Sequence, residues 1–227
     1  MPKSSKRPRG SQRYTAQVFR PYVSALGQLA LAWNDLQESL ASLFWTTMSK
    51  GIPLAGDKVD FAALFVWHAV KSDRYQKDML RAAVQRSITD WKRQKFRDDA
   101  TWLLDRANEL ENWRNDAIHS PLFAVDRSIY GLTEAAAREA VAPAWWLQNP
   151  RAINLSRRQH LLGEFRHCRD TAIVLSDFAR SIDGALVNPR RPWPDRPSLP
   201  IRKPKKDRQH PQARPKSPTP QPQPSLE

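Results

Sequence analysis

The chain has 227 residues, of which 40% are apolar, and a formal net charge of +14. This length fits one ordinary domain with flexible ends, and the apolar content is sufficient for a hydrophobic core. Cys168 is the single cysteine, which excludes an internal disulfide framework and a CxxC metal knuckle. Neither a secretory signal nor an apolar segment long enough to span a bilayer is recognisable, so we expect a soluble cytoplasmic protein.

The positive charge is concentrated at the two ends of the chain. Residues 1–20 carry a net charge of +6 and residues 187–227 carry +7, so the middle of the chain is nearly neutral. Twelve of the 19 prolines lie in residues 189–224, where large apolar residues are rare. We therefore expect a basic disordered tail over 1–20, a helical bundle over 21–186, and a disordered tail rich in Pro, Lys and Arg over 187–227.

The first predicted helix begins at Pro21 and ends near the Lys50-Gly51 pair. Its apolar residues alternate steps of four and three, as one buried helix face requires: Tyr22, Leu26, Leu29, Trp33, Leu36, Leu40 and Leu43. A short and largely buried helix is predicted over 61–70. Ser72 is the expected N-cap of a further helix that runs from Asp73 to about residue 88.

A second long helix is predicted to start between Asp90 and Asp98 and to end at Ser120, because Pro121 disfavours a helical conformation at the residue before it. Its packing stripe again steps by four and three: Phe96, Ala100, Leu103, Ala107, Leu110, Arg114 and Ala117. Arg114 thus occupies an apolar seam. Trp91, Trp102 and Trp113 recur every eleven residues, which places them on a second face.

The helical periodicity lapses over 121–150. Residues 122–129 and 142–148 are candidate strands of a hairpin, whereas 133–140 has the composition of a short helix. A last helix is expected from about Ser156 to about Gly184. The sequence therefore predicts an all-α protein, an antiparallel bundle of four to five helices with an irregular or β-hairpin insertion around 121–150.

A guanidinium in a packing seam is unfavourable by several kcal/mol unless an anion or a set of acceptors meets it. Three interpretations follow for Arg114. It has an internal charge partner, with Glu38 or Glu111 as the candidates; it faces a second copy of the chain across a two-fold axis; or a cleft at that axis holds a phosphate that Arg114 binds.

The neighbouring residues favour a polar cleft. Asn115 and His119 share one helix face, and Arg114 lies about 140° round the helix from His119, a gap that its long side chain could narrow. The last helical turn favours an imidazolium at His119, which could then transfer protons near neutral pH. Arg114 could hold phosphate oxygens through its planar fork. These are the groups that a metal-free cleavage of a phosphodiester needs.

The sequence Arg114-Asn115-Asp116-Ala117-Ile118-His119, at the end of a long helix, resembles the motif of the HEPN superfamily: Arg, a polar residue, then His after four to six intervening positions. The likeness in fold covers about residues 21–185. It implies a homodimer with two motifs in one cleft and, in active members, metal-independent RNA cleavage without a cofactor. The ribose 2′-hydroxyl would attack the adjacent phosphate, His119 would move protons and Arg114 would stabilise the transition state, with Asn115 orienting the phosphate or the imidazole.

Other functions remain open at this point. The same cleft could serve a non-catalytic module that binds a nucleotide, RNA or a partner protein, and an antitoxin-type or scaffolding protein is a third class. His160, His167 and Cys168 could be imagined as metal ligands, but the sequence favours structural roles and no metal site. Trp145 and Trp146 could stack on bases, although anchoring of the insertion onto the bundle is the favoured interpretation.

Overall fold

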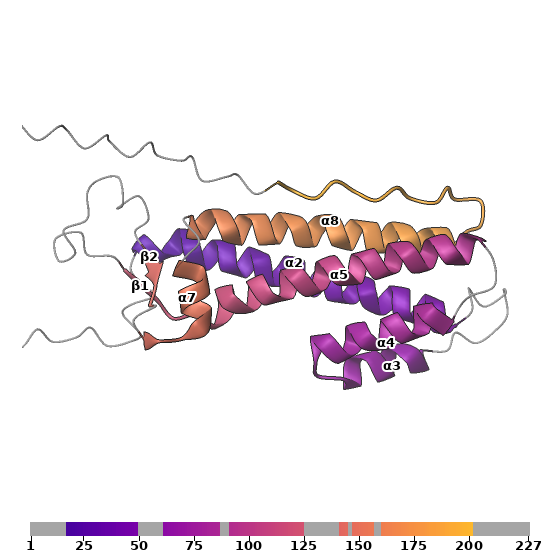
Figure 1. Ribbon diagram of the computed structural model, residues 1–227, viewed down its shortest axis with the longest axis horizontal. Coiled ribbons are helices and arrows are strands. Elements are labelled where there is room, and N and C mark those ends of the chain that lie inside the picture. The colour runs from indigo at the N-terminus through magenta and orange to yellow at the C-terminus, as the bar shows by residue number, and fades with distance from the viewer. Residues whose placement is uncertain are drawn as a thin grey trace, which may run out of the picture.

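The computed structural model describes residues 17–49, 61–86, 91–124, 141–144, 147–156 and 160–201. These residues form an all-α bundle with one small sheet, as predicted (Figure 1). No helix among them combines the length and the apolar character needed to cross a membrane. The elements are η1 (Gln17–Phe19), α2 (Arg20–Met48), α3 (Ala62–Ala69), α4 (Asp73–Arg86), α5 (Trp91–His119), β1 (Leu122–Ala124), β2 (Val141–Pro143), α7 (Pro150–Ser156) and α8 (Leu161–Val187).

The helices of the bundle alternate in direction along the chain, so α5 runs antiparallel to both α2 and α8 (Figure 1). As a consequence α2 and α8 run parallel to each other, and they form the most extensive helix pair. The short helices α3 and α4 cover the half of α2 that lies away from the hairpin. The predicted antiparallel bundle is therefore confirmed for helices that follow one another in the chain.

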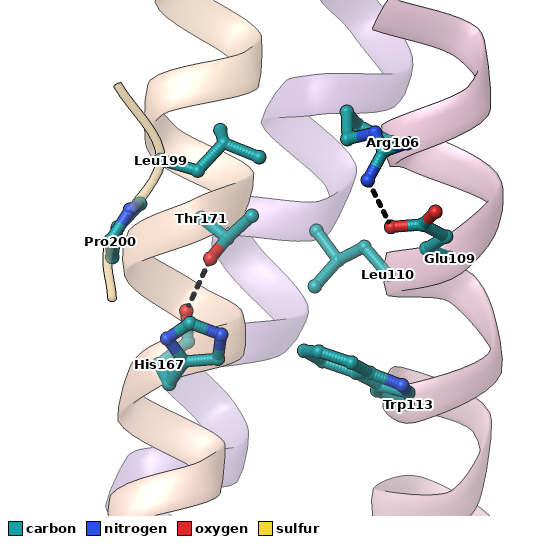
Figure 2. A pocket seen from close by; sticks show the side chains of 8 residues that line it. All are labelled: Arg106, Glu109, Leu110, Trp113, His167, Thr171, Leu199 and Pro200. Carbon is teal, nitrogen blue, oxygen red and sulfur yellow. Dashed lines mark hydrogen bonds and ion pairs between the residues drawn. The ribbon is translucent and has the colours of Figure 1, made fainter. Parts of the chain in front are cut away.

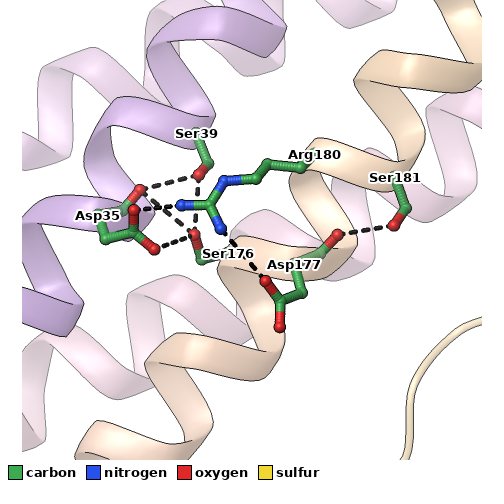
Figure 3. A network of polar contacts seen from close by, with 6 residues as sticks. All are labelled: Asp35, Ser39, Ser176, Asp177, Arg180 and Ser181. Carbon is green, nitrogen blue, oxygen red and sulfur yellow. Dashed lines mark hydrogen bonds and ion pairs between the residues drawn. The ribbon is translucent and has the colours of Figure 1, made fainter.

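Polar contacts fix the axial register of α2 against α8 (Figure 3). The hydroxyls of Ser39 and Ser176 are both buried and lie 2.8 Å apart, and Ser176 also donates to the Asp35 carboxylate at 2.7 Å. Arg180 pairs with the other oxygen of that carboxylate. Because each hydroxyl is bonded, these buried serines hold the register without an unsatisfied polar group.

The apolar stripe predicted for α5 is buried throughout, apart from Arg114. The second face is confirmed at two of its three tryptophans. The Trp102 ring meets Phe178 of α8 edge-on at 5.5 Å, and the Trp113 ring lies 5.7 Å from that of His167, also on α8. The side chain of Trp91 lies outside the described residues.

Ser72 lies just before α4, as predicted. Its hydroxyl accepts from the backbone N–H of Tyr75 at 3.5 Å, and the Gln76 side chain donates to the carbonyls of Trp67 and Val70, both at 3.0 Å. These bonds tie the end of α3 to the first turn of α4. The orientation of α4, which matters for the site below, is thus fixed locally.

The predicted hairpin is present with shorter strands. β1 and β2 pair antiparallel, with Leu122 opposite Pro143, and the N–H of Ala144 donates to the carbonyl of Pro121 at 2.7 Å. Because β1 follows α5 after Ser120 and Pro121, this strand pairing fixes the end of α5. The helix predicted over 133–140 and the Trp145-Trp146 pair lie outside the described residues.

The start of the last helix differs from the prediction. Ser156 ends a separate helix, α7, and α8 begins at Leu161 and continues past Gly184 to Val187. Pro150 is a favourable first residue for a helix, but α7 has seven residues, too few to show a helical repeat of apolar positions.

The predicted C-terminal tail also differs from the structure over its first part. Residues 188–201, here called the C-terminal segment, turn back after α8 and run along the bundle (Figure 1). Trp193 and Leu199 pack against the core. Ile201, the other large apolar residue of this Pro-rich stretch, is exposed. The burial of Trp193 and Leu199 offsets part of the entropy of ordering the segment. Residues 1–16 and 202–227 of the predicted tails lie outside the described residues.

Candidate functional site

A polar cluster lies where the packing stripes of α2, α4 and α5 meet. On α4, Asp73 and Lys77 share one stripe with the buried Leu80 and Val84, since the steps between these residues are four, three and four. This stripe brings two charges into the interface with α2 and α5. The resulting set, here called the Trp33 cluster, comprises Trp33, Asp73, Lys77, Glu111, Arg114 and Asn115.

Arg114 lies in the seam of α5, and 23% of its side chain is exposed. Its guanidinium carbon is 5.4 Å from the centre of the Trp33 ring, close enough for a cation–π interaction. One terminal nitrogen donates to the side-chain oxygen of Asn115 at 2.8 Å and lies 4.0 Å from the Asp73 carboxylate. The buried Nε has no hydrogen-bond partner among the described residues. The cation is therefore only partly satisfied.

Trp33 connects the charges of this cluster. Its indole N–H donates to the Asp73 carboxylate at 3.0 Å, the same oxygen that Arg114 approaches. The ammonium of Lys77 lies 5.5 Å from the centre of the Trp33 ring. The Trp33 indole thus contacts two cations and orients the Asp73 carboxylate between α2 and α4. These contacts fix the position of the Arg114 guanidinium.

The charge partner of Arg114 differs from both predicted candidates. Glu111 pairs with Lys77, of which 1% is exposed, and Glu38 lies 3.7 Å from His68 on the surface. The acidic group beside Arg114 in the described structure is Asp73. The position of α4 along α5 explains why Asp73 is the partner. Lys77 lies opposite Glu111, so the start of α4, with Asp73, lies opposite Arg114.

His119 is the last residue of α5 and is exposed, whereas Asn115 one turn earlier is half-buried. The helix is continuous over both residues, so the offset of about 140° between Arg114 and His119 holds in the monomer. No contact joins these two side chains among the described residues. The structure therefore brings Arg114 to Asn115 and leaves the imidazole open to an incoming group.

Sequence reasoning missed three members of the cluster. Trp33 was expected as a core residue only, Asp73 as the first residue of a helix, and Lys77 was not singled out. Their signal is the period of α4: a four-three-four stripe that begins with Asp and Lys and ends with Leu and Val places both charges in a helix interface.

The other candidates have structural environments. Cys168 is buried in the core, and His167 lies against Trp113. His160 is the exposed N-cap residue of α8, and its side chain makes no capping hydrogen bond. In the part of the chain that the structure describes, no group of three or more His, Cys, Asp or Glu side chains is arranged to hold a metal ion.

No protein-family model, curated protein or solved structure matches the chain. The Trp33 cluster and His119 are the groups of the described structure whose chemistry bears on function. A guanidinium has several N–H donors in one plane, and Arg114 uses one of them in a hydrogen bond of normal length. Its other donors are suited to an anion with several oxygens, such as a phosphate.

Proposed function

We propose that the protein is a metal-independent RNA endonuclease of HEPN type, with Arg114, Asn115 and His119 at the cleft of a homodimer. The observation that carries the proposal is the guanidinium of Arg114, whose side chain is 23% exposed and makes one hydrogen bond of normal length among the described residues, on the same helix end as an exposed histidine. A partly exposed cation in a helix seam is suited to binding an anion.

The proposed reaction needs no external reactant. The 2′-hydroxyl of a ribose attacks the adjacent phosphorus, and the bond from phosphorus to the 5′-oxygen of the next nucleotide breaks. The products are a 2′,3′-cyclic phosphate and a free 5′-hydroxyl. His119 takes the proton from the 2′-hydroxyl or delivers one to the leaving oxygen, and Arg114 stabilises the charge on the phosphate oxygens. Asn115, which accepts a hydrogen bond from Arg114, orients the guanidinium.

Exposed apolar side chains on α3 and α4 support the dimer. In α3, 75% of Phe65 is exposed and Val66 is also exposed, as is Tyr75 in the first turn of α4. Contact with a second copy would remove these side chains from water. Two Arg114 side chains would then approach one cleft, and a polyanion would offset their repulsion.

The basic ends of the chain support a polyanionic substrate. Residues 1–20 and 187–227 carry most of the net charge of +14 and would raise the rate of encounter with RNA in the cytoplasm. This attraction is not specific for sequence, so the choice of target would depend on the cleft.

The test is incubation of the purified protein with single-stranded RNA in EDTA, with analysis of the product ends. We expect cleavage that yields 2′,3′-cyclic phosphate ends and is lost in Arg114→Ala and His119→Ala. His160→Ala and Arg86→Ala, which change exposed residues of the same types elsewhere, are the matched controls and should cleave like wild type. Equal amounts of intact RNA with wild type and all variants would refute the enzyme.

One observation favours the second candidate, a non-catalytic helical module. Arg114 is already partly satisfied within one chain by Asn115, Asp73 and Trp33. Such a module would bind RNA, a nucleotide or a partner protein such as an antitoxin through the same residues, and would leave the RNA uncut. Retention of labelled RNA that Arg114→Ala weakens, without cleavage, would identify it.

A further inference from the structure

The C-terminal segment lies in a groove between α5 and α8 that has no role in the proposed reaction. Its Trp193 ring lies 6.3 Å from that of Phe96 on α5, edge to face, and the Arg196 guanidinium is 6.0 Å from the Trp102 ring. Further along, Leu199 and Pro200 lie beside α8 at Thr171. The groove is therefore lined with aromatic side chains and filled by an extended, proline-rich peptide.

Exposure along this segment repeats every three residues. Pro194, Pro197 and Pro200 are all half-buried, whereas Asp195, Ser198 and Ile201 are all exposed. The remaining face carries Trp193 and Leu199, which are half-buried, and Arg196, which is exposed but contacts Asp99 and the Trp102 ring. A period of three is that of a polyproline II helix, in which every third side chain shares one face. The segment thus presents two faces to the groove and one to solvent.

Asp99 binds the polar groups of the C-terminal segment. It is fully buried in α5 and accepts hydrogen bonds from the Trp193 indole at 2.8 Å and from Arg196 Nε at 2.5 Å. Lys95, one turn earlier, donates to it at 2.9 Å. Burial raises the pKa of Asp99, but the bonds from Trp193, Arg196 and Lys95 outweigh burial and hold the pKa below its ordinary value. A buried carboxylate that depends on donors from the peptide is a specific recognition point.

The groove contains a cavity of about 250 Å³ beside Leu199 and Pro200 (Figure 2). Leu110 and Trp113 of α5 face His167 and Thr171 of α8 across it. Its lining combines two aromatic rings with apolar side chains, which is the composition of a ligand-binding groove.

We propose that the α5–α8 groove is a binding site for extended proline-rich peptides that carry a tryptophan and an arginine three residues apart, and that residues 188–201 occupy it as a tethered ligand. Docking of polyproline II peptides onto aromatic-lined grooves is a general recognition mode, because the peptide loses little conformational entropy on binding. The acid that pairs with the arginine of the ligand gives the site direction and selectivity.

The experiment uses the full chain with Trp193→Ala and Arg196→Ala combined, which removes the two anchors of the tethered ligand. A fluorescently labelled synthetic peptide of residues 188–201 is titrated, and its anisotropy is measured. We expect saturable binding to the variant. Binding to wild type should be weaker by about a hundredfold or more, because the tethered segment competes at an effective concentration of order millimolar.

Two controls test specificity. Asp99→Ala added to the double variant should weaken peptide binding by roughly tenfold or more, because both charge-assisted bonds are lost. A peptide with the same two alanines should not bind. Absence of peptide binding to a variant with unchanged circular dichroism, or equal binding of both peptides, would overturn the proposal. A wild-type dimer that the peptide dissociates would instead assign the groove to the segment of a second copy and overturn the tethered arrangement.

A second variant addresses failure of the double variant to fold. In this variant a protease site replaces residues 188–190 of the full chain, and Trp193 and Arg196 are kept. The purified protein is then cut at that site, which separates the rest of the C-terminal segment from α8. Exchange of the released fragment for labelled peptide supports the proposal. A fragment that stays bound during days of dialysis against excess peptide shows a permanent structural element and refutes it.

Discussion

The two polar centres of α5 differ in how completely their hydrogen bonds are satisfied. Asp99, near the start of the helix, accepts from three donors, while Arg114, about four turns later, makes one hydrogen bond and keeps a buried Nε without a partner in the described structure. A fully bonded buried charge stabilises the fold, whereas a partly bonded one leaves capacity for a ligand. The groove around Asp99 and the proposed catalytic end of α5 at Arg114 therefore differ in how much hydrogen-bonding capacity is left for a ligand.

The two centres also differ in where their partners come from. The donors to Asp99 are up to 97 residues away in the sequence, whereas Arg114 bonds to the next residue. The distant partners of Asp99 belong to a segment that could leave the groove. The hydrogen bonds that Asp99 accepts from them therefore depend on whether the groove is occupied. The partners of Arg114 belong to the bundle itself. Variants at each centre should therefore have different consequences.

The largest effect is expected from Lys77→Met, which leaves Glu111 in the interface without its cation. We expect a loss of about 3 kcal/mol in the free energy of unfolding, at the lower end for a broken buried pair because Glu111 keeps some exposure. Urea denaturation measures it. Arg81→Ala, which breaks the more exposed Arg81–Asp105 pair between the same helices, is the control and should cost less than about 1 kcal/mol. Equal losses in the two variants would mean that the buried Lys77–Glu111 pair contributes no more to stability than the more exposed Arg81–Asp105 pair.

Asp99→Ala should have the next largest effect, a loss of about 2 kcal/mol, because two anchoring bonds of the C-terminal segment disappear. Backbone ¹⁵N NMR relaxation should show greater mobility in residues 193–199 and no change in α2. Asp98→Ala, at an exposed neighbour that bonds to Gln94, is the matched control. Unchanged mobility of the segment would show that apolar contacts alone hold it.

A pH dependence follows from the lowered pKa of Asp99. The unfolded state binds a proton at this residue more readily than the folded state, so the stability that Asp99 contributes is complete above about pH 4 and is lost as the pH falls through the folded-state pKa. The difference in melting temperature between wild type and Asp99→Asn should therefore narrow below pH 4. A difference that is constant from pH 7 to pH 3 would contradict this assignment.

The smallest effect is expected from Trp33→Phe, which keeps an aromatic ring beside Arg114 and Lys77 but removes the hydrogen bond to Asp73. A loss of about 1 kcal/mol is expected, because the freed carboxylate is partly exposed and gains water. Trp102→Phe, which removes the same atoms from a ring that packs on Phe178, controls for size. If the two variants lose equal stability, the bond from Trp33 to Asp73 contributes nothing measurable.

Much of the helical layout could be predicted because it depends on local properties. The four-three stripe of α2 and the place of Arg114 on its stripe agree with the structure, and α5 ends at His119, one residue before the predicted Ser120. The tryptophans at 102 and 113 also share the expected face. Helix α7 was missed because seven residues carry too little periodicity.

The sequence by itself determined which face of the long helices α2 and α5 is buried, since backbone geometry assigns every side chain an angle about the helix axis. It did not do so for α3, which was predicted to be largely buried and has Trp67 as its one buried residue. Only the tertiary structure decided that Arg114 meets Asp73, that Glu111 meets Lys77, and that residues 188–201 return to Asp99. Those pairings depend on how far one helix is shifted along another and on where a distant segment docks. Both are set by the sum of many apolar contacts over the whole interface, which no local pattern in the chain records.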